Sequence, residues 1–275
     1  MSDELFPPHA VRKARRWVQI GVTPAAALSA GDRACLYEEI SDLTSGLTEA
    51  SRIENHFFMH KPPGLRLRFQ ARPHRRSEVV TAVGLAADRW AASGLVSGWT
   101  HGCYEPETAL FGGEVSMRFV HRLFSADSSV WLHHHAAGRA PAWLVALLLT
   151  KSLLDAFRIT PWEDSDVGHL IQRTGRTLAG TTAASGEVVT RVSELWRDPR
   201  ELLRELNETE TEVVTSFRAS ARAEVPRWQA EYLDTPLVTV GPRRLIACYA
   251  VFMWNRARLS PFRQGLLADS LARIT

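Results

Sequence analysis

The stretch "HFFMHKPPGLRLRF", residues 56–69, holds two apolar, aromatic-rich runs separated by the turn-forming residues Pro-Pro-Gly. In the second run, three apolar residues alternate with Arg66 and Arg68, and a period of two is typical of a half-buried β-strand. The pattern predicts two neighbouring antiparallel strands, over 55–61 and 63–69. The exposed face of the second strand carries two adjacent arginines, which are either solvated or available to an anionic partner.

Periodicity and turn residues predict both strands and helices in the rest of the chain. Two further strands are predicted over 17–22 and 95–105. Helices are predicted over 31–49, over 75–93 with an end at Ser93-Gly94, from Glu114 onward, over 141–158, over 198–234 (one or two helices), over 241–259 and over 260–275. A sheet followed by helices indicates an α+β fold. We expect one domain over residues 1–275, with an antiparallel sheet in the N-terminal half packed by helices and a mostly helical C-terminal half.

Two local signals concern the start of a helix and a loop. Thr160 followed by Pro161 is the pattern of a helix N-cap and first helical position. TAASGE, residues 182–187, is the most loop-like segment of the chain.

The bulk composition is that of a folded protein without a strong charge bias. The chain has 275 residues, of which 45% are hydrophobic and 23% charged, with a net charge of +3. This charge is too small to indicate nucleic acid by itself. The dense basic clusters RKARR, 12–16, and RPHRR, 72–76, suit an acidic peptide, a tRNA or solvent.

Cysteine usage and hydropathy predict a cytoplasmic protein. The three cysteines include no C-x-x-C pair, so a disulfide framework or structural zinc is not expected. The N-terminus lacks the apolar core of a signal peptide. The most apolar run, 142–150, is too short to span a bilayer. We therefore expect no membrane partner and no DNA partner.

Familiar catalytic and cofactor motifs are absent. The sequence contains no G-x-G-x-x-G, P-loop, G-x-S-x-G or H-E-x-x-H pattern. His133, His134 and His135 are consecutive, and adjacent helical positions do not share a face, so a joint metal site is not expected. A helix end or loop suits this run better.

The segment YEPETALFGG, residues 104–113, follows a predicted strand. Tyr104 ends the strand, and Glu105 and Glu107 flank a proline. Paired carboxylates can exchange protons when their environments separate their pKa values; a solvated loop is the simpler interpretation. Gly112-Gly113 indicates a close backbone approach before a helix.

Two helical segments carry polar residues within apolar runs. Asp155 follows Lys151 by four residues, so spacing alone favours a surface ion pair. The segment CYAVFMWNR, 248–256, places Asn255 and Arg256 in a very apolar helix, where they need partners. The candidate partners of the Arg256 guanidinium are Glu105, Glu107 and the carbonyl groups of a ligand.

Four of these motifs occur together, in order, in a known family. "HFFMHKPPGLRLRF", "YEPETALFGG", "RLFSADSS" and "MWNR" resemble the elimination domain of class I lanthipeptide dehydratases and its thiopeptide relatives, over roughly residues 17–260. One activity in that family removes glutamate from glutamylated Ser or Thr. The other, the pyridine synthase, joins two dehydroalanines by formal [4+2] aza-cycloaddition and then loses water and the leader peptide.

Departures from the eliminating pattern favour the pyridine synthase. Eliminating members resemble H-M-H-x-N-R near the C-terminus, and Val251 and Met253 stand at the two histidine positions. Leu110 replaces an arginine before the aromatic-Gly-Gly segment. Elimination needs an acid and a base near the leaving group, and these groups are missing. The chain is also expected to act alone, without a glutamylation domain.

The resemblance implies a site and partners. The predicted catalytic residues are Asp155, Tyr104, Tyr249 and Glu105. The predicted substrate-binding residues are Arg66, Arg68, Phe111, Cys248, Phe252, Trp254, Asn255 and Arg256. The expected partner is a leader-bearing, azole-containing precursor peptide, with other thiopeptide maturation enzymes as further partners, and no metal or other cofactor is expected. For Arg66 and Arg68, binding of peptide carbonyls or acidic leader residues stands beside a structural pairing with Glu105 and Glu107.

Three other functions remain open at this stage. The chain could be a glutamate-eliminating dehydratase subunit or a non-catalytic chaperone that binds the leader. An RNA-binding module ranks last, because no stacking platform or RNA motif accompanies the basic clusters.

Overall fold

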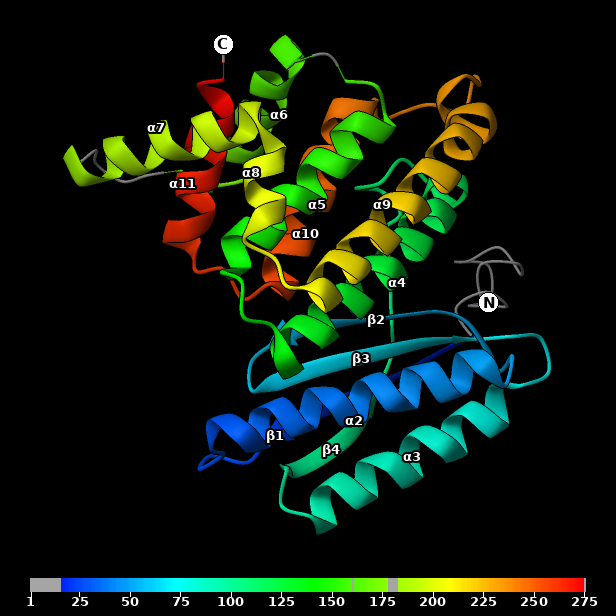
Figure 1. The fold of residues 1–275 in the computed structure, drawn as a ribbon. Coiled ribbons are helices and arrows are strands. Elements are labelled where there is room, and N and C mark those ends of the chain that lie inside the picture. Colours follow the sequence, from blue (N-terminus) through cyan, green and yellow to red (C-terminus); the bar gives the residue numbers. More distant parts are fainter. Residues whose placement is uncertain (1–15, 160, 178–182, 275) are drawn as a thin grey trace. The chain divides into compact units, whose positions relative to one another are not determined.

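The computed structural model describes residues 16–159, 161–177 and 183–274. Within them the chain forms two compact units. The first unit holds the chain up to Pro106 together with His135–Ala137, and the second holds Glu107–His134 and the chain from Gly138 on. The α+β fold is confirmed, with an antiparallel sheet in the N-terminal half and a mostly helical remainder (Figure 1). One domain over 1–275 stays a prediction.

Four antiparallel strands form the sheet of the first unit, in the spatial order β2-β3-β1-β4. The strands are β1 (Trp17–Pro24), β2 (Ile53–Lys61), β3 (Gly64–Ala71) and β4 (Val96–Gly102). The predicted alternation in β3 is confirmed, because Leu67 and Phe69 are each 1% exposed whereas Arg66 is exposed. In register with them, Ile20 and Val18 of β1 are also buried. Apolar burial on this face fixes the pairing, since a slip by one residue would turn it to solvent.

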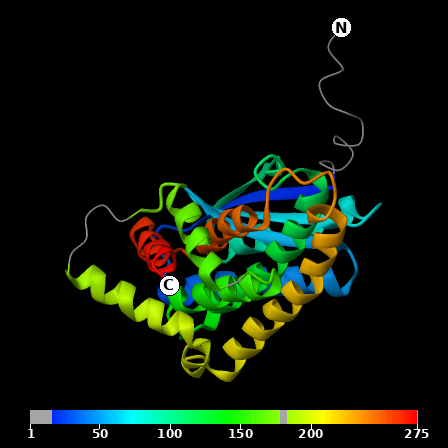
Figure 2. The same ribbon diagram turned by 90° about the horizontal axis from the view of Figure 1, so that it is seen from above.

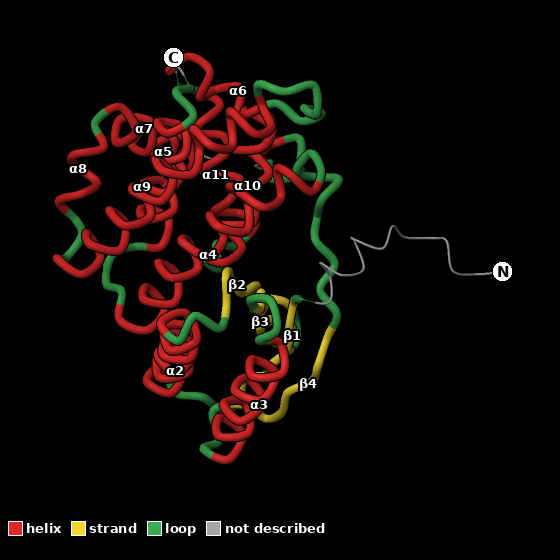
Figure 3. The backbone as a smooth tube through the Cα atoms, turned by 90° about the vertical axis from the view of Figure 1, so that its right-hand side faces the viewer, coloured by secondary structure: helices red, strands yellow, loops and turns green. Residues whose placement is uncertain are grey.

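Two helices cover the apolar face of the sheet, α2 (Ala30–Glu49) and α3 (Arg76–Ala92) (Figure 3). Ser29 and Asp32 cap α2 reciprocally, which satisfies N–H groups that the first turn leaves free. Trp90 of α3 donates its indole N–H to Glu39 of α2 at 3.1 Å. The predicted end of α3 at Ser93-Gly94 is confirmed, with Gly94 at a φ of +77°.

In the described residues of the second unit, all the regular secondary structure is helical. Its elements are α4 (Glu114–Ala137, whose last three residues group with the first unit), α5 (Ala142–Ala156), the 3₁₀ turn η1 (Pro161–Glu163), α6 (Asp164–Gln172), α7 (Ala183–Arg197), α8 (Pro199–Arg204), α9 (Glu208–Trp228), the π-turn η2 (Gln229–Leu233), α10 (Pro242–Arg256) and α11 (Pro261–Ala272). The apolar helix α5 lies between α9 and α10, and α6 lies against α10 and α11 (Figures 1 and 2).

Several sequence predictions have clear outcomes here. The histidine run 133–135 falls at the end of α4, as predicted. The predicted loop over 182–187 is wrong, because α7 begins at Ala183. Thr160 and residues 12–15 of the first basic cluster lie outside the described residues. No described helix has the length and apolarity that crossing a membrane requires.

Gly112 allows the close approach that the sequence predicted for the Gly112-Gly113 pair, and the neighbour is the side chain of a tyrosine. Both glycines have positive φ, +79° and +101°. A Cβ atom on Gly112 would lie 2.0 Å from the hydroxyl oxygen of Tyr232, whereas one on Gly113 would meet nothing within 4 Å. That hydroxyl accepts the backbone N–H groups of Thr239 and Val240, both at 2.9 Å. Gly112 thus makes room for the side chain that fixes the segment before α10.

The two glycines give a matched test of this contact. Gly113→Ala should cost about 1–3 kcal/mol of unfolding free energy, from backbone strain alone. Gly112→Ala should cost at least about 1 kcal/mol more, because it also displaces Tyr232. Chemical denaturation of the two variants measures the difference. Equal losses would show that the Tyr232 contact adds nothing.

His56 on β2 makes the stability of the first unit depend on pH. Burial lowers the pKa of its imidazole to about 4, while an unfolded histidine titrates near pH ~6.5. The unfolded chain therefore binds a proton first as the pH falls. The contribution of neutral His56 to the free energy of unfolding is therefore complete above pH ~6.5. It is lost as the pH falls from there towards ~4.

Unfolding free energy should accordingly be lower at pH 5 than at pH 7, by about 1–2 kcal/mol from this one group. His56→Gln should reduce the change in unfolding free energy between pH 7 and pH 5. His74→Asn, at an exposed position, should leave that change as in the wild type. Urea titrations across this pH range provide the measurement. A His56→Gln curve parallel to that of the wild type would contradict the assignment.

Candidate functional site

Each unit presents one surface that carries predicted site residues. In the first unit this is the arginine face, defined as Arg66, Arg68, Gln19, Phe57 and Tyr104. In the second unit it is the α10 stripe, defined as Cys248, Phe252 and Asn255. The two surfaces are described separately.

Arg68 is held in place by contacts on the sheet. Its Nε donates to Oε1 of Gln19 at 2.7 Å, and Nε2 of Gln19 donates to the carbonyl of Cys103 at 3.2 Å. Its guanidinium carbon lies 4.5 Å from the ring centre of Tyr104 and 5.0 Å from that of Phe57. Stacking on two rings limits the positions that this cation can take.

Arg66 differs from Arg68 in its surroundings. Its side chain is exposed, and it forms no ion pair with any described residue. The side chains of Glu105 and Glu107 are also exposed, and neither forms an ion pair with a described residue. The structural pairing of the arginines with Glu105 and Glu107 is therefore not observed. Arg66 keeps its donors available for a ligand.

Tyr104, predicted to transfer protons, has a structural contact as well. It is 5% exposed, and its ring packs edge-on against Trp17 at a centroid distance of 4.8 Å. Trp17 makes a similar edge contact with Phe57 at 5.6 Å. These three rings form the apolar wall on which Arg68 rests.

The α10 stripe follows helical spacing, i, i+4 and i+7, along one side of α10. Phe252 and Asn255 are partly exposed, and Cys248 is 7% exposed. Burial raises the pKa of the Cys248 thiol, so it stays protonated near neutral pH. The stripe thus offers an aromatic ring, an amide and a neutral thiol.

Two buried rings support Phe252 from behind. Its ring centre lies 5.6 Å from those of both Phe111 and Phe124, and Phe111 and Phe124 lie 5.9 Å apart. Phe111 is 0% exposed and Phe124 is 1% exposed. Phe111 therefore fixes the position of Phe252 and does not itself reach a ligand.

A buried polar cluster joins α4 to α10. Asp127, Tyr249 and Arg256 are all 0–1% exposed. Arg256 binds Asp127 through two nitrogens, Nε to Oδ1 and Nη2 to Oδ2, each at 2.6 Å. Tyr249 donates its hydroxyl to Oδ2 of Asp127 at 2.6 Å. The pair thus combines a close ion pair through Nε with one charge-assisted hydrogen bond through Nη2.

This cluster corrects two predictions. Arg256 meets Asp127, not a glutamate of segment 104–113 or a ligand carbonyl. Burial, followed by the charge of Asp127, raises the pKa of Tyr249 well above its usual value, and its proton is committed to Asp127. Tyr249 is therefore not suited to proton transfer with a substrate.

Trp254 is also buried, contrary to its predicted role in binding. It is 0% exposed, and its indole N–H donates to Oγ1 of Thr150 at 3.3 Å. The contact fastens α10 to α5. Of the predicted residues in the C-terminal motif, only Phe252 and Asn255 are partly exposed.

Asp155 lies in a different part of the second unit. It is exposed on α5 and pairs with Lys151, as spacing alone predicted. Its charge adds to the burial that raises the pKa of Asp164, whose Oδ2 accepts the indole N–H of Trp196 at 2.8 Å. No hydrogen bond or ion pair joins Asp155 to the α10 stripe.

Sequence reasoning missed Asp127 and Gln19. Asp127 lies within the quoted motif RLFSADSS. An acidic residue among the apolar residues of a predicted helix was the signal that could have identified it. Gln19 alternates with apolar residues in β1 and gave no signal of its own. Among the described residues, no group of three or more His, Cys, Asp or Glu side chains is arranged to hold a metal ion.

Comparison with known proteins identifies the class first. Residues 17–275 match the protein family described as "Lantibiotic biosynthesis dehydratase C-term". The chain belongs to this family. No curated protein sequence matches the chain.

A solved structure shares the fold. The crystal structure of the tRNA-dependent lantibiotic dehydratase MibB from Microbispora sp. 107891 matches with a TM-score of 0.67 and 19% sequence identity. The match covers 93% of this chain and 28% of the MibB chain. The chain thus spans less than a third of the length of MibB, and at this identity the likeness concerns the fold alone.

Asp127→Asn tests the buried cluster. The variant leaves the Arg256 cation without its counter-charge in a site closed to water, which should cost about 3–5 kcal/mol of unfolding free energy. Asp155→Asn is the matched control, since the loss of an exposed helical pair should cost at most about 0.5 kcal/mol. Denaturant unfolding compares the two. Similar small losses in both variants would show that the Asp127–Arg256 pair does not hold α4 to α10.

Proposed function

We propose that the chain is a pyridine synthase of thiopeptide maturation. It would join two dehydroalanines of a leader-bearing, azole-containing peptide by formal [4+2] aza-cycloaddition, followed by loss of water and of the leader. The supporting observation concerns two positions of α10 outside the stripe. Neither Val251 nor Met253, which stand where eliminating relatives have histidine, can exchange protons, and Met253 is fully buried.

The α10 stripe suits binding and orientation of an azole-containing peptide. Phe252 offers a ring that two buried aromatics hold still, and the Asn255 amide can bond to peptide groups. Its Oδ1 already accepts from Nε2 of Gln264 at 3.0 Å, which orients the amide. Bringing two reacting groups together can supply effective molarities of about 10⁵ M or more. A reaction that forms new bonds between two parts of one peptide gains most from this effect.

The arginine face of the first unit, taken by itself, is suited to hold a peptide through hydrogen bonds. Arg66, with its donors available, would bind peptide carbonyls or acidic leader residues. Glu105, exposed next to Tyr104, would accept and return protons during formation of the iminol and loss of water. Asp155 remains a proposed proton-transfer residue in addition to Tyr104, although it pairs with Lys151. Asp155→Asn should then slow cyclisation and leave peptide affinity unchanged, and normal turnover would remove Asp155 from the mechanism.

One observation favours a second function. Arg66 and Arg68 are both retained, and in eliminating relatives arginines of this motif are implied to contact the glutamyl adduct. A glutamate-eliminating subunit therefore remains the alternative. Its acid and base would have to come from residues other than those of the α10 stripe.

Mass spectrometry separates the candidates. The protein is incubated with a leader-bearing azole peptide that has two dehydroalanines, and in parallel with a glutamylated peptide. A macrocycle together with free leader carboxamide is the expected product. Loss of glutamate from the second substrate would instead establish the eliminating subunit. Binding of both peptides without any mass change would indicate a leader-binding chaperone.

Phe252→Ala tests the stripe. Removal of the stacking ring should lower kcat/KM for cyclisation by roughly threefold to tenfold, equivalent to about 0.5–1.5 kcal/mol. Leu85→Ala removes an apolar side chain that is 57% exposed on α3 and should leave kcat/KM unchanged. Steady-state kinetics of both variants provide the comparison. Unchanged kinetics for Phe252→Ala would remove this residue from the substrate site.

A further inference from the structure

A polar pocket lies between α6 and α10 in the second unit, apart from the α10 stripe. Its volume is about 690 Å³, within the range of small-ligand sites. The residues that line it are Asp166, His169, Leu170, Gln172, Arg173, Thr177 and Arg243. None of them belongs to the predicted site.

The two arginines of the pocket differ in availability. Nη1 of Arg243 pairs with Asp166 at 2.6 Å and with Glu163 at 3.1 Å, so two carboxylates neutralise it. Arg173, at the end of α6, is exposed, and its side chain forms no ion pair or hydrogen bond with any described residue. Arg173 is thus the positive charge that the pocket offers to a ligand.

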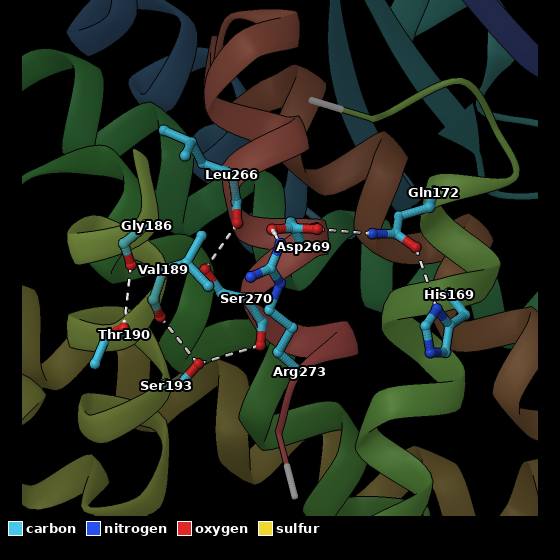
Figure 4. A network of polar contacts seen from close by, with 10 residues as sticks. All are labelled: His169, Gln172, Gly186, Val189, Thr190, Ser193, Leu266, Asp269, Ser270 and Arg273. Carbon is cyan, nitrogen blue, oxygen red and sulfur yellow. Dashed lines mark hydrogen bonds and ion pairs between the residues drawn. The ribbon is translucent and has the colours of Figure 1, made fainter. Parts of the chain in front are cut away.

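A hydrogen-bond relay orients His169 at the pocket. Nε2 of Gln172 donates to Oδ1 of Asp269 at 3.3 Å, and Oε1 of Gln172 lies 3.2 Å from Nδ1 of His169 (Figure 4). Because the Gln172 oxygen can only accept, Nδ1 of His169 carries the proton in this contact. Nε2 of the imidazole then remains as an acceptor for a ligand N–H.

Packing against α11 fixes the helix that carries these groups. A Cβ atom on Gly168 would lie 2.3 Å from the backbone nitrogen of Ala272, so α6 and α11 are in close backbone contact. Asp269 is itself held by Arg273 at 2.9 Å. The relay therefore starts from a supported carboxylate, and the pocket groups are largely preorganised.

Apolar surface adjoins the charged groups. Leu170 is partly exposed in the pocket lining. A free carboxylate or phosphate would not use this side chain, and it would fill a small part of the volume. A peptide with acidic and apolar side chains would use both Arg173 and Leu170.

We infer that this pocket binds an acidic, partly apolar peptide segment. A carboxylate side chain of the peptide pairs with Arg173, a peptide N–H donates to Nε2 of His169, and an apolar side chain contacts Leu170. The assignment rests on the available guanidinium of Arg173, the oriented imidazole of His169 and the partly exposed side chain of Leu170. Naming the segment as the leader of a precursor peptide rests, in addition, on the proposed function.

Binding of a defined probe tests the inference. The probe is a fluorescein-labelled decapeptide of alternating Glu and Leu, followed by fluorescence anisotropy. Arg173→Gln should weaken binding about tenfold, as expected for loss of a charge-assisted hydrogen bond. Arg200→Gln is the matched control, because it removes the same charge from an exposed position on α8 and should leave affinity within about twofold. His169→Leu should weaken binding by a smaller factor.

Four outcomes would overturn the inference. One is equal affinity of Arg173→Gln and the wild type. Another is an equal loss in Arg200→Gln, which would show a general effect of net charge. The third is displacement of the probe by inorganic phosphate at constant ionic strength, which would assign the pocket to small anions. Retained binding of a Gln-for-Glu decapeptide would likewise exclude the carboxylate contact.

The assay involves no turnover, so its result is independent of the cyclisation test. If no substrate is cyclised but the probe binds through Arg173, the proposed function fails and the pocket assignment stands. If cyclisation occurs and the probe does not bind, the pocket assignment fails alone. If both hold, Arg173→Gln should raise KM for a leader-bearing substrate and leave kcat unchanged.

Discussion

The ion pair between Asp127 and Arg256 is the constraint on which the second unit depends. Removing two charges from water is costly, and the cost is offset only when geometry and hydrogen bonding are close to ideal. Here both carboxylate oxygens are used, and Tyr249 adds a further donor. Because the guanidinium also lies 4.2 Å from the ring centre of Phe124, the pair orients the aromatic layer behind Phe252. Buried contacts within the helix bundle thus fix the position of Phe252 on the exposed side of α10.

Whether a side chain already has partners also separates four of the described arginines into two pairs. Arg68 and Arg256 stack on aromatic rings and have polar partners, so their charges contribute to the fold. Arg66 and Arg173 are exposed, and neither forms an ion pair with a described residue. A guanidinium that is already paired has little to offer a ligand, whereas an available one on a supported backbone does. Functional assignment of an arginine therefore needs its partners as well as its motif.

How much the sequence predicts follows from the range of the interactions involved. The β2–β3 hairpin, the start of α4 after Gly113 and the end of α3 at Gly94 depend on local periodicity and backbone freedom, and these were predicted. The partner of Arg256 lies 129 residues away on α4, and no local pattern encodes that pairing. The same holds for the approach of Tyr232 to Gly112. Motifs located the important segments, but tertiary contacts decided which side chains in them are exposed.

These contacts also change the meaning of the motif at the end of α10. Taken as a string, MWNR suggests three ligand-binding residues, Trp254, Asn255 and Arg256. In the structure, Met253, Trp254 and Arg256 are each 0% exposed, and Asn255 alone is partly exposed. Most of the motif therefore preserves the attachment of α10 to α4 and α5, which any activity on this fold would require. Specific chemistry has to come from the side chains that stay accessible, and on this side of α10 these are Phe252 and Asn255, while the neighbouring Cys248 thiol is protonated and mostly buried. A surface of that kind orients a substrate more readily than it protonates one, which is the physical reason for preferring cycloaddition over elimination.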